Sequence, residues 1–297
     1  MKPSTGDRIV SVIIHILLII IGFVSIYPFW NAAVISFNNG IDALKGGITF
    51  WPREFTLDNY KFVFKDKRLI NGFIISVLRT GLGTAGAILC TSIFAYGMSK
   101  KELIGRKFYM GMAVFTMYFS GGLIPSYLLI RDLGLVNTFW VMVIPGLISV
   151  WNMIVFRTFF KSLPPGLEES AKIDGCTNWG VFFRIVFPLS GPVMATIALF
   201  TAVYHWNDWF APGLYINNPD LLPIQTKLQQ IMNSNIMTEQ LKQMDSAAAA
   251  HLSSLRSVTT KSLTMATMMV ATFPILLVYP FLQKYFVKGV MIGSIKE

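Results

Sequence analysis

Six long apolar stretches limit what this chain can fold into. A helix needs roughly 20 mainly apolar residues to cross roughly 30 Å of hydrocarbon. Apolar residues make up 54% of the chain and charged residues 13%, and the mean hydropathy is +0.56, far from the balance of a soluble domain. We therefore predict an all-α polytopic membrane protein, one domain over residues 1–297 with six transmembrane helices. The stretches are residues 9–29, 72–98, 108–130, 138–160, 186–210 and 263–287.

Basic residues orient the predicted helices, because Lys and Arg collect in cytoplasmic connections. The clearest case is the short connection 99–107, SKKELIGRK. Its placement puts both termini and residues 161–186 in the cytoplasm, and residues 38–71 and 211–262 outside. The first stretch is longer than the apolar region of a signal peptide and lacks a small-residue cleavage site, so we expect an uncleaved first span. Topology and anionic inner-leaflet lipids then account for the net charge of +10 without nucleic acid.

The two outer segments are each predicted to contain a surface helix. The first includes FTLDNYKFVF, which is half apolar and has Asp58 as a possible cap. The second includes PIQTKLQQIMNSN and an alanine run at 247–250, and both favour helix.

A polar element separates the fourth and fifth apolar stretches. The prolines at 164 and 165 suit the entry of a helix, because a first-turn residue has no intrahelical use for its N–H. Glu168 and Glu169 are predicted in the first turn, where negative charge complements the helix dipole. Gly175 can take the left-handed conformation that closes a helix, and Thr177 can cap a second one. The sequence therefore predicts a short helix, a glycine turn and a second helix.

The spacing of this element resembles the cytoplasmic EAA loop of ABC importer permeases, which reads EAA, three residues, G, nine residues, I, one residue, LP. Here the loop reads ESAKIDGCTNWGVFFRIVFP, and the departures, Ser170 for Ala and Phe187 for Leu, keep the spacing. The resemblance implies that residues 161–186 form a cytoplasmic coupling loop that rests on an ATPase. The residues it assigns to ATPase coupling are Glu168, Glu169, Ser170, Ala171, Asp174, Gly175, Ile185 and Pro188.

The resemblance covers nearly the whole chain, and residues 38–71 are its least informative part. Residues 201–225 are similar to the W-N-[DE]-[FW]…P segment that ends the fifth span of carbohydrate importer permeases of the maltose-type family. Residues 264–297 resemble the sixth span of that family and its Q-[KR]-Y-F-V-x-G ending. Residues 118–140 look like the subgroup named for the LplC and YtcP permeases, which is linked mainly to oligosaccharides and polysaccharide fragments.

This family implies a larger machine in the bacterial cytoplasmic (inner) membrane. Such a permease pairs with a second homologous permease, two ATPases dock below, and an extracytoplasmic solute-binding protein delivers the sugar. The ATPases would bind ATP and Mg. When ATP binding closes the two ATPases on each other, the cavity between the permeases would switch from facing the cytoplasm to facing outward. The tail at residues 288–297 matches the family's C-terminal tail, which can reach the ATPase interface.

Polar and aromatic residues at membrane depth are candidates for the substrate path, because they are costly unless they line a cavity or find partners. Trp151 and the fifth-span aromatics could stack on a sugar, while an interfacial belt or interhelical hydrogen bonds explain the same residues without a ligand. Arg79 could select an acidic sugar, snorkel outward or pair with a carbonyl. The candidates are Tyr118, Ser120, Trp151, Asn152, Tyr204, Trp206, Asn207, Asp208 and Arg79.

Intrinsic enzyme chemistry is not expected, because the sequence contains no G-x-x-x-x-G-K-[ST] phosphate loop and no catalytic motif. The three histidines, His15, His205 and His251, fall in different regions and predict no metal site. Two alternatives to a carbohydrate permease stay open: an ABC importer permease for another solute, such as a polyamine or an amino acid, and a membrane scaffold or enzyme without a transport role.

Overall fold

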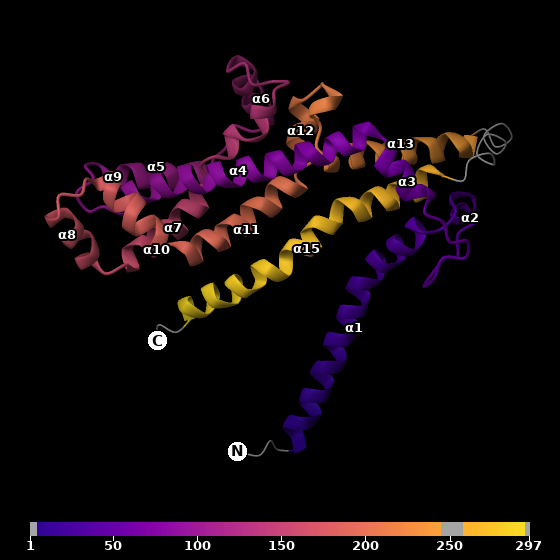
Figure 1. Ribbon diagram of the computed structural model, residues 1–297, viewed down its shortest axis with the longest axis horizontal. Helices are drawn as coiled ribbons and strands as arrows, with labels where there is room; N and C mark the ends of the chain where they lie inside the picture. The colour runs from indigo at the N-terminus through magenta and orange to yellow at the C-terminus, as the bar shows by residue number, and fades with distance from the viewer. Residues whose placement is uncertain (1–4, 245–257, 295–297) are drawn as a thin grey trace. The chain divides into compact units, whose positions relative to one another are not determined.

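The computed structural model describes residues 5–244 and 258–294, and this part of the chain is helical, with one isolated antiparallel bridge between Asn38 and Phe55 (Figure 1). Three helices are each long and apolar enough to cross a membrane, as predicted for the first, second and sixth stretches. They are α1 (Thr5–Ser36), α4 (Lys67–Ser99) and α15 (Thr260–Ser294). In α15, the part that is long and apolar enough to cross a membrane is Thr260–Val278.

The third, fourth and fifth stretches, each predicted as one transmembrane helix, each consist of two helical parts with a bend between them. The chain bends by 116° between α5 (Arg106–Tyr118) and α6 (Leu123–Asp132). It bends by 45° between the 3-10 turns η1 (Phe139–Met142) and η2 (Ile144–Gly146) and the helix α7 (Val150–Ser162). It bends by 78° between the helix over residues 178–189 and α11 (Gly191–Asn207). Counted with each bent pair as one span, the described residues contain up to six helical segments that are long and apolar enough to cross a membrane.

Each break has a local cause in the sequence. Gly122 has a φ of +86°, a conformation open to glycine, so α5 cannot run on into α6. Pro145 lies in a 3-10 turn, and the Ser149 hydroxyl accepts from the Asn152 backbone N–H at 3.3 Å, which starts α7 anew. Pro192 lacks an N–H and occupies the first turn of α11. Hydropathy averaged along a stretch does not detect these interruptions.

The contacts divide the chain into two units, and the first comprises residues 1–70 and 228–273. It holds α1, α2 (Gly40–Leu44), α3 (Asp58–Lys65) and the start of α15. A small apolar cluster of Val34, Ile35, Ala43 and Ile48, with Met265 against it, joins the end of α1 to α15.

A buried polar network holds the outer segment 38–71 in this unit. The Asn59 side-chain amide donates to the Ser36 and Asn38 carbonyls, both at 2.9 Å, and accepts from the Ser262 hydroxyl at 2.8 Å. The Asn38 amide donates to Asp42 Oδ2 at 3.0 Å. This hydrogen bond is the main cause that holds the pKa of Asp42 below its ordinary value, and Arg53 and Lys45 lower it further.

The surface helices predicted in the outer segments are present. α3 confirms the first, but Asp58 is not its cap: Leu57 occupies that position, and Asp58 lies in the first turn with Lys61 at 3.1 Å. α13 (Ile224–Met244) confirms the helix over PIQTKLQQIMNSN. The alanine run, His251 and residues 295–297 of the tail lie outside the described residues.

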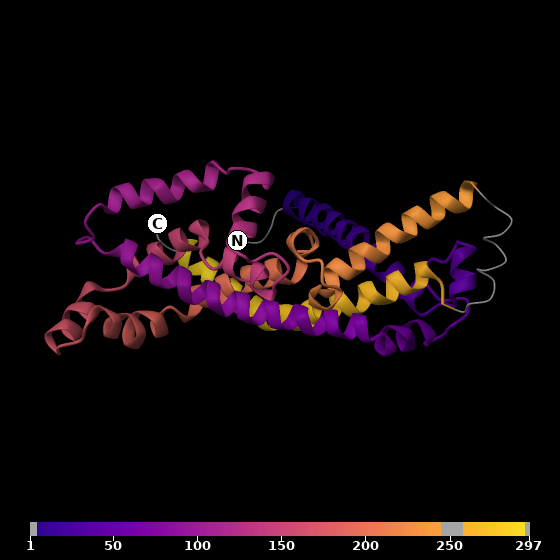
Figure 2. The same ribbon diagram turned by 90° about the horizontal axis from the view of Figure 1, so that it is seen from above.

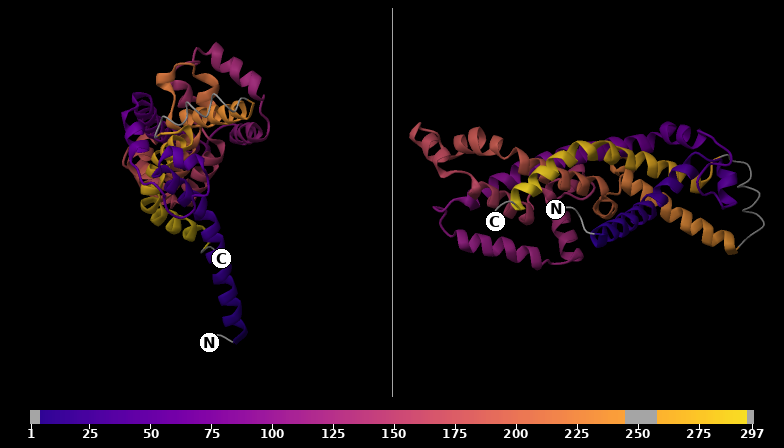
Figure 3. Two further views of the ribbon diagram at one scale, coloured as in Figure 1. Left: turned by 90° about the vertical axis from the view of Figure 1, so that its right-hand side faces the viewer. Right: turned by 90° about the horizontal axis from the view of Figure 1, so that it is seen from below.

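The second unit comprises residues 71–227 and 274–297 (Figures 2 and 3). One apolar cluster of this unit includes Ile75, Val141 and Ile216. Asn137, with a φ of +59°, joins two loops: its side-chain oxygen accepts from the Asn217 and Asn218 N–H groups at 3.0 and 2.8 Å. The other helices of this unit are α8 (Pro165–Ile173), α9 (Asn178–Val181), the π turn η3 (Phe182–Val186), α10 (Phe187–Leu189), α12 (Phe210–Tyr215) and η4 (Pro219–Leu221).

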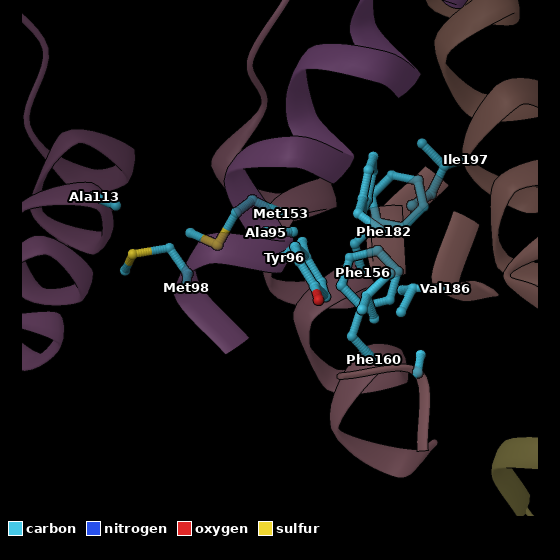
Figure 4. Packing of buried hydrophobic residues seen from close by; sticks show 12 residues of the cluster. Ala95, Tyr96, Met98, Ala113, Met153, Phe156, Phe160, Phe182, Val186 and Ile197 are labelled. Atoms are coloured by element: carbon cyan, nitrogen blue, oxygen red, sulfur yellow. The ribbon is translucent and has the colours of Figure 1, made fainter. Parts of the chain in front are cut away.

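The main apolar core of the second unit gathers side chains from α4, α5, α7, α8, α11 and the helix over residues 178–189 (Figure 4). Phe182 lies among Tyr96 and Phe160, with ring centroids 5.1 and 6.5 Å away. Phe156 stacks on Phe160 at 5.7 Å. Because Phe182 comes from the polar element that follows α7, this core anchors that element to the membrane helices.

Candidate functional site: the coupling loop and the fifth span

α8 begins where the prolines predict. Pro164 is its N-cap residue and Pro165 its first residue, so the missing N–H of Pro165 costs no helical hydrogen bond. Glu168 lies in the first turn as predicted, whereas Glu169 lies one residue beyond it. Ala171 is buried against the core, while Glu169 and Ser170 are exposed. One face of α8 is therefore fixed, and the opposite face is free for a partner.

Gly175 ends α8 in the left-handed conformation that the sequence predicts, with a φ of +82°. The Cys176 N–H donates to the Ala171 carbonyl at 2.9 Å, and the Gly175 N–H donates to the Lys172 carbonyl at 3.0 Å. This pair of bonds is a Schellman closure, which satisfies two carbonyls that the helix end would leave unpaired. Asp174, the C-cap residue, lies exposed beside the turn.

The second helix starts at the predicted cap, because the Thr177 hydroxyl accepts from the Gly180 N–H at 3.2 Å. It runs to Leu189 through the π turn η3. Pro188 has no N–H for the Arg184 carbonyl and its ring would clash with that carbonyl, so the helix widens just before it. Ile185 is half-buried against the core, and Pro188 is exposed.

An ion pair between Lys100 and Glu168 ties the connection 99–107 to α8, and both side chains are mostly buried. The Lys100 ammonium also lies 4.0 Å from the centre of the Tyr96 ring. In the same connection, a hydrogen bond from its own backbone N–H lowers the pKa of Glu102, and the positive charges of Lys172 and Lys100 lower it further. The sequence signalled Lys100 only as a topology marker, so its role in holding α8 was missed.

Arg79 and Asp208, both predicted as path candidates, bind each other. Arg79 is 1% exposed; its Nη1 donates to the Asp208 carbonyl at 2.7 Å, and its Nη2 forms an ion pair with Asp208 Oδ2. Asp208 Oδ1 accepts from the Phe210 and Ala211 N–H groups, both at 3.1 Å, and so starts α12. Pairing with a carbonyl was one predicted fate for Arg79. The Asp208 carboxylate also pairs with the guanidinium, and selection of an acidic sugar by Arg79 stays a prediction.

Further contacts on α4 hold the same corner of the fold. The Asn71 amide donates to the Asp220 carbonyl, and the Ser76 hydroxyl accepts from the Ile224 N–H at 2.9 Å. One face of α4 therefore fixes the connection from the end of α11 to the start of α13. Sequence reasoning missed Ser76, because a lone serine in an apolar stretch carries no distinguishing signal.

The fifth-span aromatics divide between the two faces of α11. Trp206 is 6% exposed and packs edge to face on Phe73, with ring centroids 5.7 Å apart. Trp206 is therefore a packing residue in this structure, and its role as a stacking surface for sugar stays a prediction. Tyr204 and Asn207 lie one turn apart on the opposite face and are exposed.

The remaining candidates lie on other elements. Tyr118 ends α5 and Ser120 lies in the break before α6, so both lie near the middle of the bent third span over residues 106–132, and both are exposed. Trp151 and Asn152 lie in the first turn of α7, inside the bent fourth span over residues 139–162; Trp151 is exposed and Asn152 half-buried. All four stand beside helix breaks, which is a shared feature of the broken third and fourth spans.

Residues 83–292, which include the coupling loop and α11, match the family described as "Binding-protein-dependent transport system inner membrane component". The chain belongs to this family. It is 38% identical to the polygalacturonan/rhamnogalacturonan transport system permease protein YtcP of Bacillus subtilis (strain 168), over 98% of this chain and 99% of that protein. It is 39% identical to protein LplC of the same organism, over 100% of this chain and 98% of that protein.

The fold is also similar to that of a solved permease. A chain in the crystal structure of a bacterial ABC transporter involved in the import of the acidic polysaccharide alginate superposes with a TM-score of 0.86 at 27% identity, covering 96% of this chain and 99% of that one. The prediction of an importer permease of the LplC/YtcP-like subgroup is confirmed. As a permease of this family, the chain is an integral component of the inner membrane.

Proposed function

We propose that this permease forms one half of the path by which a binding-protein-dependent ABC importer moves an oligosaccharide or polysaccharide fragment into the cell. A second homologous permease forms the other half. Two ATPases, which bind ATP and Mg, dock on the coupling loop. An extracytoplasmic binding protein delivers the sugar, and both termini of this chain face the cytoplasm.

The exposed face of the coupling loop is the observation that carries this proposal. Ile173 is 86% exposed at the tip of α8, beside Asp174, and Trp179 is exposed at the start of the second helix. Exposed large apolar side chains next to a rigid turn are typical of a protein interface. Glu168 and Phe182 fix the same element to the permease core, so a force applied to its tip moves the membrane helices with it.

The carbohydrate assignment rests on the relatives. One curated relative is named for polygalacturonan and rhamnogalacturonan transport, and the solved permease belongs to an importer of alginate. In this chain, Tyr204 and Asn207 offer an aromatic ring and an amide on one exposed face of α11, and Trp151 offers a second exposed ring. Aromatic faces and amide hydrogen bonds suit sugar rings of either charge. Tyr118, Ser120 and Asn152 stay path candidates on the same grounds.

The first helix supports the need for a membrane and a second subunit. Within the first unit, the described residues bury none of the apolar window of α1. A helix that is apolar on all sides requires lipid or other transmembrane helices around it. The rest of the proposed complex supplies both.

Ile173→Asp tests the docking proposal. A charge at the tip of α8 should leave the permease in the membrane and reduce both ATPase co-purification and sugar uptake at least tenfold. Ile104→Asp is the matched control, because Ile104 is 90% exposed in the connection 99–107, outside the coupling element. Normal uptake by the Ile173 variant, or an equal loss in the control, would contradict the proposed docking face.

The substrate class is tested with the reconstituted complex and its binding protein. Oligogalacturonides and neutral oligosaccharides are compared with a polyamine and an amino acid for stimulation of ATP hydrolysis. Stimulation by a glycan alone supports the carbohydrate assignment. Stimulation by a polyamine or an amino acid supports an importer of another solute. A complex that moves no solute although its ATPases are bound supports a scaffold.

A further inference from the structure

Five buried side-chain polar atoms on α4 and α11, all within the second unit, have no hydrogen-bond partner among the residues that the structure describes. We call this set the polar junction. Its atoms are Nε of Arg79, the side-chain oxygens of Thr80, Thr84 and Thr201, and Nδ1 of His205. An unpaired polar atom away from water costs free energy, and each such atom in a native protein requires an explanation.

The geometry of His205 shows how closely these elements approach. His205 is 2% exposed, and a Cβ placed on Gly83 of α4 would lie 2.6 Å from its Nε2. A Cβ placed on Gly146 of η2 would lie 3.4 Å from its Cε1. A second contact joins the same two helices, between Arg79 and Asp208. Arg79 lies four residues before Gly83 on α4, whereas Asp208 lies three residues after His205, at the end of α11. The two helices therefore run antiparallel (Figure 1). This register places Thr201 one turn before His205 on the same face of α11.

The three threonines differ from other helical threonines of this chain. Thr158 donates to the Ile154 carbonyl at 2.8 Å, Thr267 to Leu263 at 2.9 Å and Thr272 to Met268 at 2.8 Å, each four residues back in its own helix. That local bond is the usual way to satisfy a hydroxyl inside a helix. Thr80, Thr84 and Thr201 have no such bond although their oxygens are buried. Their hydroxyls are therefore available to a ligand within the junction.

The chemistry of the junction defines that ligand. It must be small, because the atoms that would hold it are buried. It must both donate and accept, because the Arg79 Nε–H is a donor whereas hydroxyl oxygens also accept. It must be neutral, because Asp208 already balances the charge of Arg79. A cation would be repelled by the guanidinium, and an anion would be repelled by the carboxylate. Water meets all three conditions, and a buried water typically makes about three hydrogen bonds.

We propose that the polar junction is a binding site for ordered water molecules within the permease. A bound water can exchange its partners when helices shift, whereas a direct bond between side chains must break. The site therefore stabilises the packing of α4, η2 and α11 and leaves this packing able to adjust during transport. The proposal does not depend on which sugar the permease moves.

Radiolytic hydroxyl labelling in ¹⁸O-water tests the site in the assembled complex in lipid nanodiscs, because side chains next to bound water are labelled even when buried. His205 should be labelled in spite of its burial. Met153, which is 0% exposed in the apolar core and carries a more reactive side chain, is the matched control and should stay unlabelled. A double Thr84→Val, Thr201→Val variant should reduce the labelling of His205 several-fold. Labelling of His205 no greater than that of Met153 would overturn the proposal.

The melting temperature of the same variants is an independent test, because a dry junction and a hydrated junction predict different changes. In a dry junction, valine would replace an unpaired hydroxyl and raise the melting temperature. In a hydrated junction, it removes a partner of a bound water, and the melting temperature stays the same or falls. Thr267→Val is the matched control, since Thr267 is buried and already bonded within its helix. A higher melting temperature for the double variant than for the wild type and the control would count against bound water.

Discussion

Arg79→Met should destabilise the permease whatever sugar it carries. The substitution keeps the length and apolar stem of the side chain and removes its charge. It leaves the Asp208 carboxylate, whose side chain is 12% exposed, without a cation. Breaking a buried ion pair by removing one partner costs about 3–5 kcal/mol. Since every 1.4 kcal/mol is tenfold, the ratio of folded to unfolded protein should fall by a factor of about one hundred to a few thousand.

A double variant, Arg79→Met with Asp208→Asn, separates the ion pair from other effects. The asparagine oxygen can still accept from the Phe210 and Ala211 N–H groups, so the start of α12 is kept. Replacing a whole buried pair by neutral groups is often close to neutral in free energy. The double variant should therefore recover most of the stability that the single variant loses.

The assay is the half-life of the purified complex at a fixed elevated temperature, because membrane complexes unfold irreversibly and a rate is the meaningful quantity. Arg131→Met is the control: Arg131 pairs with Asp132, both side chains are more than half exposed, and such surface pairs contribute little. If Arg79→Met were as stable as wild type and failed only with uronate-containing glycans, Arg79 would be a ligand and the argument from pairing would be wrong.

Three further predictions concern single positions. Gly175→Ala should cost about 1–2 kcal/mol, because an L-residue is disfavoured at a φ of +82°, and uptake and ATPase co-purification should fall together. Gly83→Ala should force His205 out of its position and lower the melting temperature of the complex. The pKa of Asp42 is held below 3.8 mainly by the Asn38 amide, so its contribution to stability is present above that pH and is lost as the pH falls through the lower value. Melting temperatures measured from pH 7 downward should decline less steeply for Asp42→Asn.

The coupling loop could be predicted in detail because its determinants are local. The two prolines, Gly175 and Thr177 each fix the backbone within a few residues of themselves, and the structure has each of them in the predicted role. Glu169 shows the remaining error, which is one residue at the edge of a turn. Helix starts and closures depend on neighbours in sequence, so a single sequence contains the information.

The shapes of the transmembrane spans were harder to predict than the coupling loop. Hydropathy shows where a chain is apolar, but it does not show whether the helix formed there is straight or bent. The Gly121–Gly122 pair and Pro192 were visible in the sequence, yet apolar stretches of similar length enclose both continuous and broken helices. A membrane tolerates a break only where other groups satisfy the freed backbone atoms. Whether such groups are present depends on tertiary packing, which one sequence does not reveal.

Arg79 shows why the substrate path is the least predictable part. A buried cation needs a counter-charge, and from sequence the counter-charge could be a ligand or a side chain anywhere in the protein. Its partner, Asp208, lies 129 residues away, so no local pattern indicates the pair. The pairing changes the interpretation of both residues at once, because a guanidinium bound to a carboxylate no longer offers its full charge to an acidic sugar. In this structure Arg79 is held by Asp208, whereas the ring of Tyr204 and the amide of Asn207 are exposed, and recognition of a sugar by these two groups through stacking and hydrogen bonding stays a prediction.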